Sequence, residues 1–174
     1  MQPGTQQFSA KWKEIAAREP NAFGNAQDAY VSRTHYDVAA KKIKNATGYN
    51  LDKASGALRQ VTYSTAVQHG PTGGPHVMSE AIRRTDAKMK RTDPRYEPAL
   101  INAIYDRRTE IYLATSERNK RKAEQFAKSG RTKDAAEARK RARNARNVVN
   151  NRYPKERLDA LRLLSIELRS KLKR

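Results

Sequence analysis

The chain has 174 residues, enough for one domain with a real core, but only 37% of them are hydrophobic and 32% are charged. A net charge of +19 and an isoelectric point near 10.4 predict an anionic partner, such as nucleic acid, a phospholipid surface or an acidic wall polymer, without choosing among them. The absence of cysteine excludes a disulfide framework and a thiolate metal site; no apolar run approaches the roughly 20 residues of a membrane span, and the N-terminus lacks the pattern of a signal peptide.

Three helices are expected in the first 48 residues, because apolar side chains recur there at spacings of three and four. The first, over about residues 6–18, should end before Pro20. Asn21 is of a type that caps helices and should begin the second. Asp37 should cap a short third helix that stops at Gly48.

The fourth helix should end on an unusual polar face. It follows a loop rich in Asn, Asp, Ser and Gly over residues 49–56, and Gly70 with the proline after it should end it. Gln68 and His69 would then lie at a helix end, where side chains face a cleft or water. Residues 71–75 are expected to form a loop whose last residue, a proline, starts a fifth helix. This placement favours a groove.

The second half of the chain is also helical in pattern. Asp93 and Pro94 should break the chain before a sixth helix that supplies much of the core, and Pro154 should open a last helix that packs against the sixth or serves a partner. No alternating pattern typical of strands has useful length, so we predict an all-α fold. The last helix carries a leucine stripe of Leu158, Leu161, Leu164, Leu168 and Leu172.

The segment from Arg107 to Arg146 is strongly basic, with 14 Lys or Arg against 5 Asp or Glu. Ser129 and Gly130 mark a turn between two helix-forming halves, so residues 113–147 should form a charged helical hairpin. Three interpretations stay open: a solvated helix pair laced by neighbouring charges, an arm that binds phosphates or wall polymer by displacing counterions, and a surface that docks a partner. The candidate polyanion-binding residues are Arg118, Lys120, Arg121, Lys122, Arg139, Lys140, Arg141, Arg143 and Arg146.

Five motifs occur in one order along the chain: Lys11 to Ala16, Phe23 to Asp37, Ser64 to Gly70, Ala103 to Arg108, and Asn151 to Leu161. Together they resemble the lysozyme-like C-terminal domains of type VI secretion spike effectors and of related phage peptidoglycan hydrolases. The resemblance covers most of the chain and is interrupted by the basic hairpin. It implies a single lysozyme-like helical domain over residues 1–174, in which residues 113–147 are an inserted hairpin.

The resemblance also implies what this chain lacks. In that family the catalytic Glu, and the Asp that assists it from a glycine-rich turn, precede the segment that resembles residues 8–16. Residues 1–7 contain no carboxylate, and Val38 stands where a Pro is common in the family. Glycoside cleavage by the usual route needs one carboxyl group to protonate the leaving oxygen and a second to act as base or nucleophile. We therefore assign no catalytic residue and expect the chain to be inactive alone.

Other carboxylates could replace the missing pair, since Glu14, Glu19, Asp28 and Asp37 lie in the first helices and His35 is near enough in sequence to tune one of them. Surface charges, a helix cap and a packed histidine explain the same residues more simply. The three histidines match no compact metal-ligand spacing, and the glycines near them lack the Lys and Ser or Thr of a phosphate loop. We expect neither a metal nor a cofactor.

Two functions stay open. The first is a phage or secretion-apparatus protein related to peptidoglycan-cleaving muramidases, acting in wall binding, as one part of a split hydrolase, or as a structural virion component. It would travel in a virion or through a secretion apparatus, with peptidoglycan or another anionic polymer and other apparatus proteins as partners. The second is a basic nucleic-acid-binding virion or packaging protein. The groove candidates, from the resemblance and from helix-end positions, are Thr34, His35, Tyr36, Asp37, Gln68 and His69.

Overall fold

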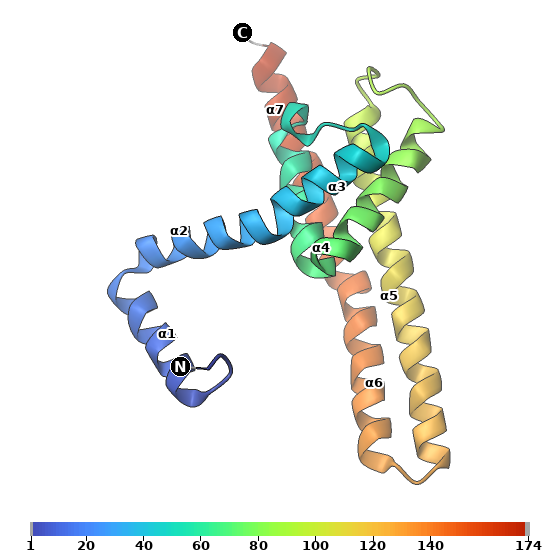
Figure 1. The fold of residues 1–174 in the computed structure, drawn as a ribbon. Coiled ribbons are helices and arrows are strands. Elements are labelled where there is room, and N and C mark those ends of the chain that lie inside the picture. Colours follow the sequence, from blue (N-terminus) through green and yellow to red (C-terminus); the bar gives the residue numbers. More distant parts are fainter. Residues whose placement is uncertain (1, 173–174) are drawn as a thin grey trace.

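The structure is a computed structural model, which describes the fold of residues 2–172 (Figure 1). Every regular element in that range is helical, so the predicted all-α class is confirmed. Helices α3, α4, α5 and α7 form the body, α1 and α2 project from one side of it, and α6 runs along the far half of α5. The elements are α1 (Gln6–Arg18), α2 (Pro20–Val31), η1 (Ser32–Tyr36), α3 (Asp37–Thr47), η2 (Leu51–Lys53), α4 (Gly56–Asp86), α5 (Tyr96–Lys128), α6 (Thr132–Asn147), η3 (Val148–Arg152) and α7 (Tyr153–Leu172).

The first three helices follow one another with little interruption, and α1 has the expected range of 6–18. Pro20 is the first residue of α2, where a missing N–H costs nothing, so Asn21 lies inside the helix rather than capping it. The π-helical turn η1 keeps the backbone helical from α2 into α3, so Asp37 does not cap α3. Both expected caps are therefore wrong. Gly48 ends α3 as expected, in a left-handed conformation with φ of 68°.

Helix α4 is kinked at the place where the sequence predicts a helix end. Gly70 has φ of 75° and ψ of 175°, which interrupts the helix, but the chain is helical again from Pro71. The expected loop over residues 71–75 is therefore wrong, because proline fits the first turn of a helix well. Pro75 has no N–H to donate to the Pro71 carbonyl, and Lys42 Nζ of α3 donates to that carbonyl instead, at 2.9 Å.

The core lies between α3, α4, α5 and α7. Its large aliphatic side chains are fully enclosed, and burial of each contributes about 1.5–3 kcal/mol of hydrophobic stabilisation. Because α4 packs against all three of the other helices, it is the central element of the body. The aliphatic core includes Ile43, Leu58, Ile82, Leu100 and Ile104.

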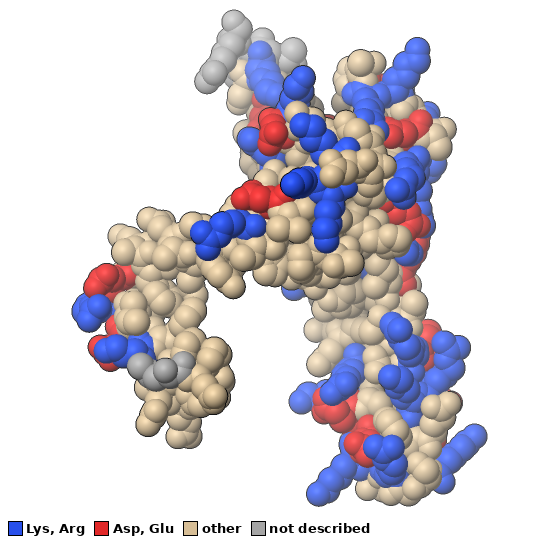
Figure 2. Space-filling view, in the orientation of Figure 1, with Lys and Arg blue, Asp and Glu red and all other residues tan. Residues whose placement is uncertain are grey.

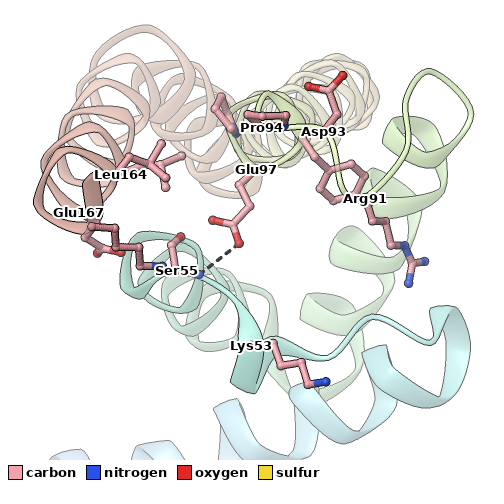
Figure 3. Close-up of a pocket in the computed structure, with 12 residues that line it drawn as sticks. Lys53, Ser55, Arg91, Asp93, Pro94, Glu97, Leu164 and Glu167 are labelled. Atoms are coloured by element: carbon pink, nitrogen blue, oxygen red, sulfur yellow. Dashed lines mark hydrogen bonds between the residues drawn. The ribbon is translucent and has the colours of Figure 1, made fainter. Parts of the chain in front are cut away.

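Two carboxylates cap the N-terminus of α4 (Figure 3). Glu167 of α7 accepts hydrogen bonds from the N–H groups of Gly56 and Ala57, each at 2.9 Å, and Glu97 of α5 accepts one from the N–H of Ser55 at 3.1 Å. A helix leaves its first N–H groups without internal partners, and negative charge suits that end of its dipole. This contact attaches both α5 and α7 to the start of α4.

Helix α7 continues from α6 through the π-helical turn η3 and begins one residue before the expected Pro154. It packs against α5, as expected for the last helix, and also against α4. Leu164 of the leucine stripe is buried, whereas Leu158 and Leu168 are 48% and 42% exposed. The side chain of Leu172 lies outside the described residues.

The basic segment forms two antiparallel helices, the second half of α5 and α6 (Figure 1). They are joined at the expected turn, where Gly130 has φ of 72°. Ser116 Oγ donates to the Ala142 carbonyl at 3.0 Å across the pair. Whether this segment is an insertion into a lysozyme-like fold stays a prediction. Small buried side chains allow the close approach, namely Ala123, Ala135, Ala138, Ala142 and Ala145.

Candidate functional site

One face of α4 stays open between η1 and α7. Gln60, Tyr63, Ser64 and Val67 recur along it at spacings of three and four, which places them on one side of the helix. Two hollows flank Gln60, which lines both of them. We call this surface the α4 groove.

The first hollow lies between α4 and η1 and has an empty volume of about 670 Å³. Two half-buried tyrosines form part of its wall: the ring centroids of Tyr36 and Tyr63 are 6.4 Å apart, with an interplanar angle of 37°. The remaining lining residues are polar, so the hollow combines aromatic faces with hydrogen-bonding groups. They are Ser32, Asp52, Arg59 and Gln60.

Arg59 and Asp52, the two charged residues of the first hollow, have no ion-pair partner among the described residues. Both lie near Tyr36. Burial raises the pKa of Tyr36, Arg59 opposes that shift, and Asp52 adds to it, which places both charges within electrostatic reach of the phenol. Neither Arg59 nor Asp52 forms a side-chain hydrogen bond in the described chain, so both groups are available to a ligand. Unpaired polar groups beside aromatic rings are typical of a ligand site.

The second hollow, on the α7 side of Gln60, has an empty volume of about 800 Å³. Glu156 and Asp159 both line it, but Glu156 is hydrogen-bonded to arginines and Asp159 forms an ion pair with one. Glu156 accepts hydrogen bonds from Arg152 and, at 3.3 Å, from Arg108, and Asp159 lies 3.8 Å from Arg162. These ion pairs make the two carboxylates poor candidates for a catalytic acid and base.

Arg108 is completely buried beneath the second hollow. Its guanidinium lies between the rings of Tyr105 and Tyr153, 4.8 and 4.5 Å from their centroids, and donates to the side chains of Gln68 and Glu156. Its Nε and Nη1 have no hydrogen-bond partner in the described chain. Aromatic faces and one carboxylate therefore carry most of the interaction with this buried charge.

Gln68 and His69 belong to the same buried cluster and line none of the described hollows. Gln68 Nε2 donates to the hydroxyl of Tyr112 at 2.7 Å, and the His69 ring meets the Tyr112 ring edge-on at 5.9 Å. Burial, with the charge of Arg108 as a smaller contribution, lowers the pKa of His69 to about 4, so the imidazole is neutral near pH 7. Both residues are half-buried rather than exposed at a helix end, because α4 continues past Gly70.

The other groove candidates lie on η1 and at the start of α3, and only Tyr36 lines a hollow. Thr34 Oγ1 donates to the Tyr30 carbonyl at 2.7 Å and lies 2.9 Å from Nδ1 of His35. Asp37 is exposed. Contact of these side chains with a ligand stays a prediction. The groove residues that sequence reasoning missed are Asp52, Arg59, Gln60 and Tyr63. The three-and-four spacing on α4 was an available signal for Gln60 and Tyr63, whereas Asp52 lies on η2.

The predicted polyanion-binding residues are all exposed on the α5–α6 pair, which is thickly covered with basic side chains in Figure 2. Glu117 binds Lys120 at 2.8 Å and Arg146 at 3.2 Å, and Glu137 binds Arg141 at 3.2 Å. Among the described residues, six cations of this set have no carboxylate partner: Arg118, Arg121, Lys122, Arg139, Lys140 and Arg143.

The described residues contain no cluster of three or more His, Cys, Asp or Glu that could hold a metal ion. No helix within residues 2–172 combines the length and the apolar character needed to cross a bilayer. The structure thus defines a strongly basic all-helical domain with an open groove on a kinked central helix.

Comparison with known proteins gives the family. Residues 1–144 match the family model described as type VI secretion system spike protein VgrG3-like, C-terminal, and the chain belongs to this family. Over 70 residues it is 31% identical to the type VI secretion system spike protein VgrG3 of Vibrio cholerae serotype O1. That stretch covers 40% of this chain and 7% of the Vibrio protein, so the chain corresponds to a small part of that relative. No solved structure matches the chain.

Proposed function

We propose that this domain binds the glycan strands of peptidoglycan in the α4 groove, as the wall-binding C-terminal part of a secretion spike. The observation that carries the proposal is the first hollow, where two tyrosine rings stand beside unpaired Arg59, Asp52 and Gln60. Sugar rings present C–H faces to aromatic side chains, and their hydroxyl and amide groups bond to carboxylate, amide and guanidinium groups. A secretion apparatus would deliver the domain, with other apparatus proteins as its partners.

We further propose that the fold is related to peptidoglycan-cleaving muramidases but that this groove binds without cleaving. A glycosidase needs two carboxyl groups across the scissile bond, about 5–9.5 Å apart, with one of them protonated as the acid. The carboxylates of the second hollow form ion pairs with arginines instead. Cleavage would therefore require a carboxylate supplied from elsewhere, such as a second polypeptide of a split hydrolase.

Co-sedimentation with purified murein tests the binding proposal. Tyr63→Ala removes one ring of the aromatic pair, and loss of one aromatic contact worth about 1.4 kcal/mol weakens binding roughly tenfold. Arg59→Ala should weaken it as well. The control is Ile166→Ala, which removes a 61% exposed apolar side chain on α7 that lines neither hollow and lies outside the arm of α1 and α2. Equal retention of all three variants on murein would contradict the proposal, and clearing of a murein suspension by the chain alone would contradict the absence of cleavage.

A second candidate function is supported by the six predicted polyanion-binding residues on α5 and α6 that have no carboxylate partner. Such a surface binds nucleic acid or another polyanion by releasing counterions, so its affinity falls steeply with salt. Titration of duplex DNA at several salt concentrations distinguishes it from glycan binding, which depends little on salt. DNA binding that survives Tyr63→Ala but not charge removal on α6 would assign the two activities to separate surfaces.

A further inference from the structure

Helices α1 and α2 form an arm, residues 6–31, that projects from the body (Figure 1). No residue of either helix is buried, and α1 packs mainly against α2. Short helices gain most of their stability from packing of an apolar face rather than from helix propensity. The arm therefore lacks, within the described chain, the surface that its apolar face requires.

The arm carries a cluster of aromatic side chains on that face. The Phe8 and Trp12 rings are 5.3 Å apart, and Trp12 meets Phe23 edge-on at 5.1 Å. Trp12 is nevertheless 44% exposed, and Tyr30 on the same stripe of α2 is 59% exposed. Ala26 is exposed between Phe23 and Tyr30. The cluster holds the two helices together but leaves Trp12, Ala26 and Tyr30 exposed.

The arm also differs from the rest of the molecule in charge. Residues 6–31 contain three basic and three acidic side chains, a net charge of zero in a chain of +19. Two of the basic residues are neutralised locally, Lys11 by Glu14 at 2.7 Å and Arg18 by Glu19 at 2.9 Å. Basic side chains gather instead on the body and on the α5–α6 pair (Figure 2). A polyanion would be attracted to those surfaces and not to the arm.

We propose that the arm is a dimerisation surface, which pairs with the same arm of a second copy to form a four-helix bundle. Two amphipathic helical hairpins bury their apolar faces in such a bundle, and identical patches close under twofold symmetry. Electrostatics favours contact between two copies through their arms over contact through their bodies. The arms carry no net charge, whereas the basic bodies repel each other and stay apart in this arrangement. The proposal goes beyond glycan binding and does not depend on it.

The available area fits a reversible dimer. A large aromatic side chain buries about 150–250 Å² in full, so the half-exposed rings of two arms, with their aliphatic neighbours, supply on the order of 1,000 Å². This lies below the area of most stable interfaces and in the range of weak, transient ones, so we expect a dimer that dissociates at micromolar or higher concentrations.

The test uses the full chain and its single tryptophan, which lies in the arm. Ala26→Glu places a charge on the outward apolar face without removing any packed side chain, since Ala26 is exposed. Asn25→Glu is the matched control, because it adds the same charge on the opposite side of α2. Sedimentation velocity and Trp12 emission are followed together from about 1 to several hundred micromolar, a range around the expected dissociation constant.

The wild-type chain and Asn25→Glu should form dimers as concentration rises, with a parallel blue shift of Trp12 emission, and added salt should favour the dimer by screening the bodies. Ala26→Glu should stay monomeric with red emission. A wild-type chain that is monomeric throughout overturns the proposal. A dimer that survives Ala26→Glu also overturns it, because the interface then lies elsewhere, and so does blue emission in a monomer, because the arm then folds onto its own body.

Discussion

The double cap at the start of α4 gives a prediction whose size follows from the structure. Glu167 accepts two backbone hydrogen bonds, from Gly56 and Ala57, each at 2.9 Å. Glu167→Ala removes both bonds together with a negative charge at the positive end of the helix. Among the hydrogen bonds of the described residues, these two are the only ones that join α7 to the first turn of α4, and the substitution removes them.

The expected cost is about 2 kcal/mol, because hydrogen bonds to charged groups contribute about 1.5–3 kcal/mol net, whereas water in the separate pocket that Glu167 lines (Figure 3) replaces part of the loss. For a protein of this size, that lowers the melting temperature by about 4–8 °C. Urea titration at constant pH and salt, followed by circular dichroism at 222 nm, measures the free energy of unfolding. A thermal scan at the same wavelength measures the melting temperature.

A double-mutant cycle with Gly56→Ala makes the test specific to this contact. A Cβ on Gly56 would lie 2.7 Å from Oε1 of Glu167, so Gly56→Ala should destabilise the wild-type chain by displacing the carboxylate. In the Glu167→Ala background the same substitution should be neutral or stabilise by about 0.5 kcal/mol, because alanine favours the helix. Additive costs in the cycle, or an unchanged melting temperature for Glu167→Ala, would refute the reasoning.

Three further predictions concern the buried cluster and the basic surface. The pKa of His69 is about 4 in the folded chain, below its ordinary value of 6.5, so the unfolded chain takes up the proton at a higher pH than the folded chain. The contribution of His69 to the free energy of unfolding is therefore complete above about pH 6.5 and falls by about 2 kcal/mol by pH 5. In urea titrations, His69→Phe should abolish this loss of stability. Arg108→Ala should cost about 3 kcal/mol in the same titrations, because it leaves Gln68 and an enclosed space between two rings without a partner, and a cost below 1 kcal/mol would contradict its structural role. DNA binding through the six cations without carboxylate partners should weaken with salt at a log–log slope of about −5.4, and charge removal at Arg139, Lys140 and Arg143 should bring the slope to about −2.7.

Local chemistry made much of the fold readable from the sequence. Apolar spacing correctly predicted α1, Gly48 correctly predicted the end of α3, and Ser129 and Gly130 correctly predicted the turn between α5 and α6. The errors came where a helix continues through a residue that usually ends one. Asp37 follows a π-helical turn, and the prolines after Gly70 start the second half of a kinked helix.

The candidate site was less predictable, because burial depends on partners distant in sequence. Arg108 lies in a run of charged residues that predicts exposure, yet tyrosines of α5 and α7 enclose it completely. Gln68 is half-buried because its side chain accepts a hydrogen bond from Arg108 of the same cluster. Conversely, the spacing of Gln60 and Tyr63 shows that they share a face of α4, but only the positions of η1 and α7 show that this face is open.

Calorimetric titration with a soluble wall tetrasaccharide tests the central claim most directly. The chain should bind one tetrasaccharide per groove, and Tyr63→Ala should bind it about tenfold more weakly with the stability of the fold unchanged. Ile166→Ala should bind like the wild-type chain, since its side chain lines neither hollow. Absence of binding heat in the wild-type chain, or equal affinities of the wild-type chain and Tyr63→Ala, would contradict a glycan-binding groove on α4.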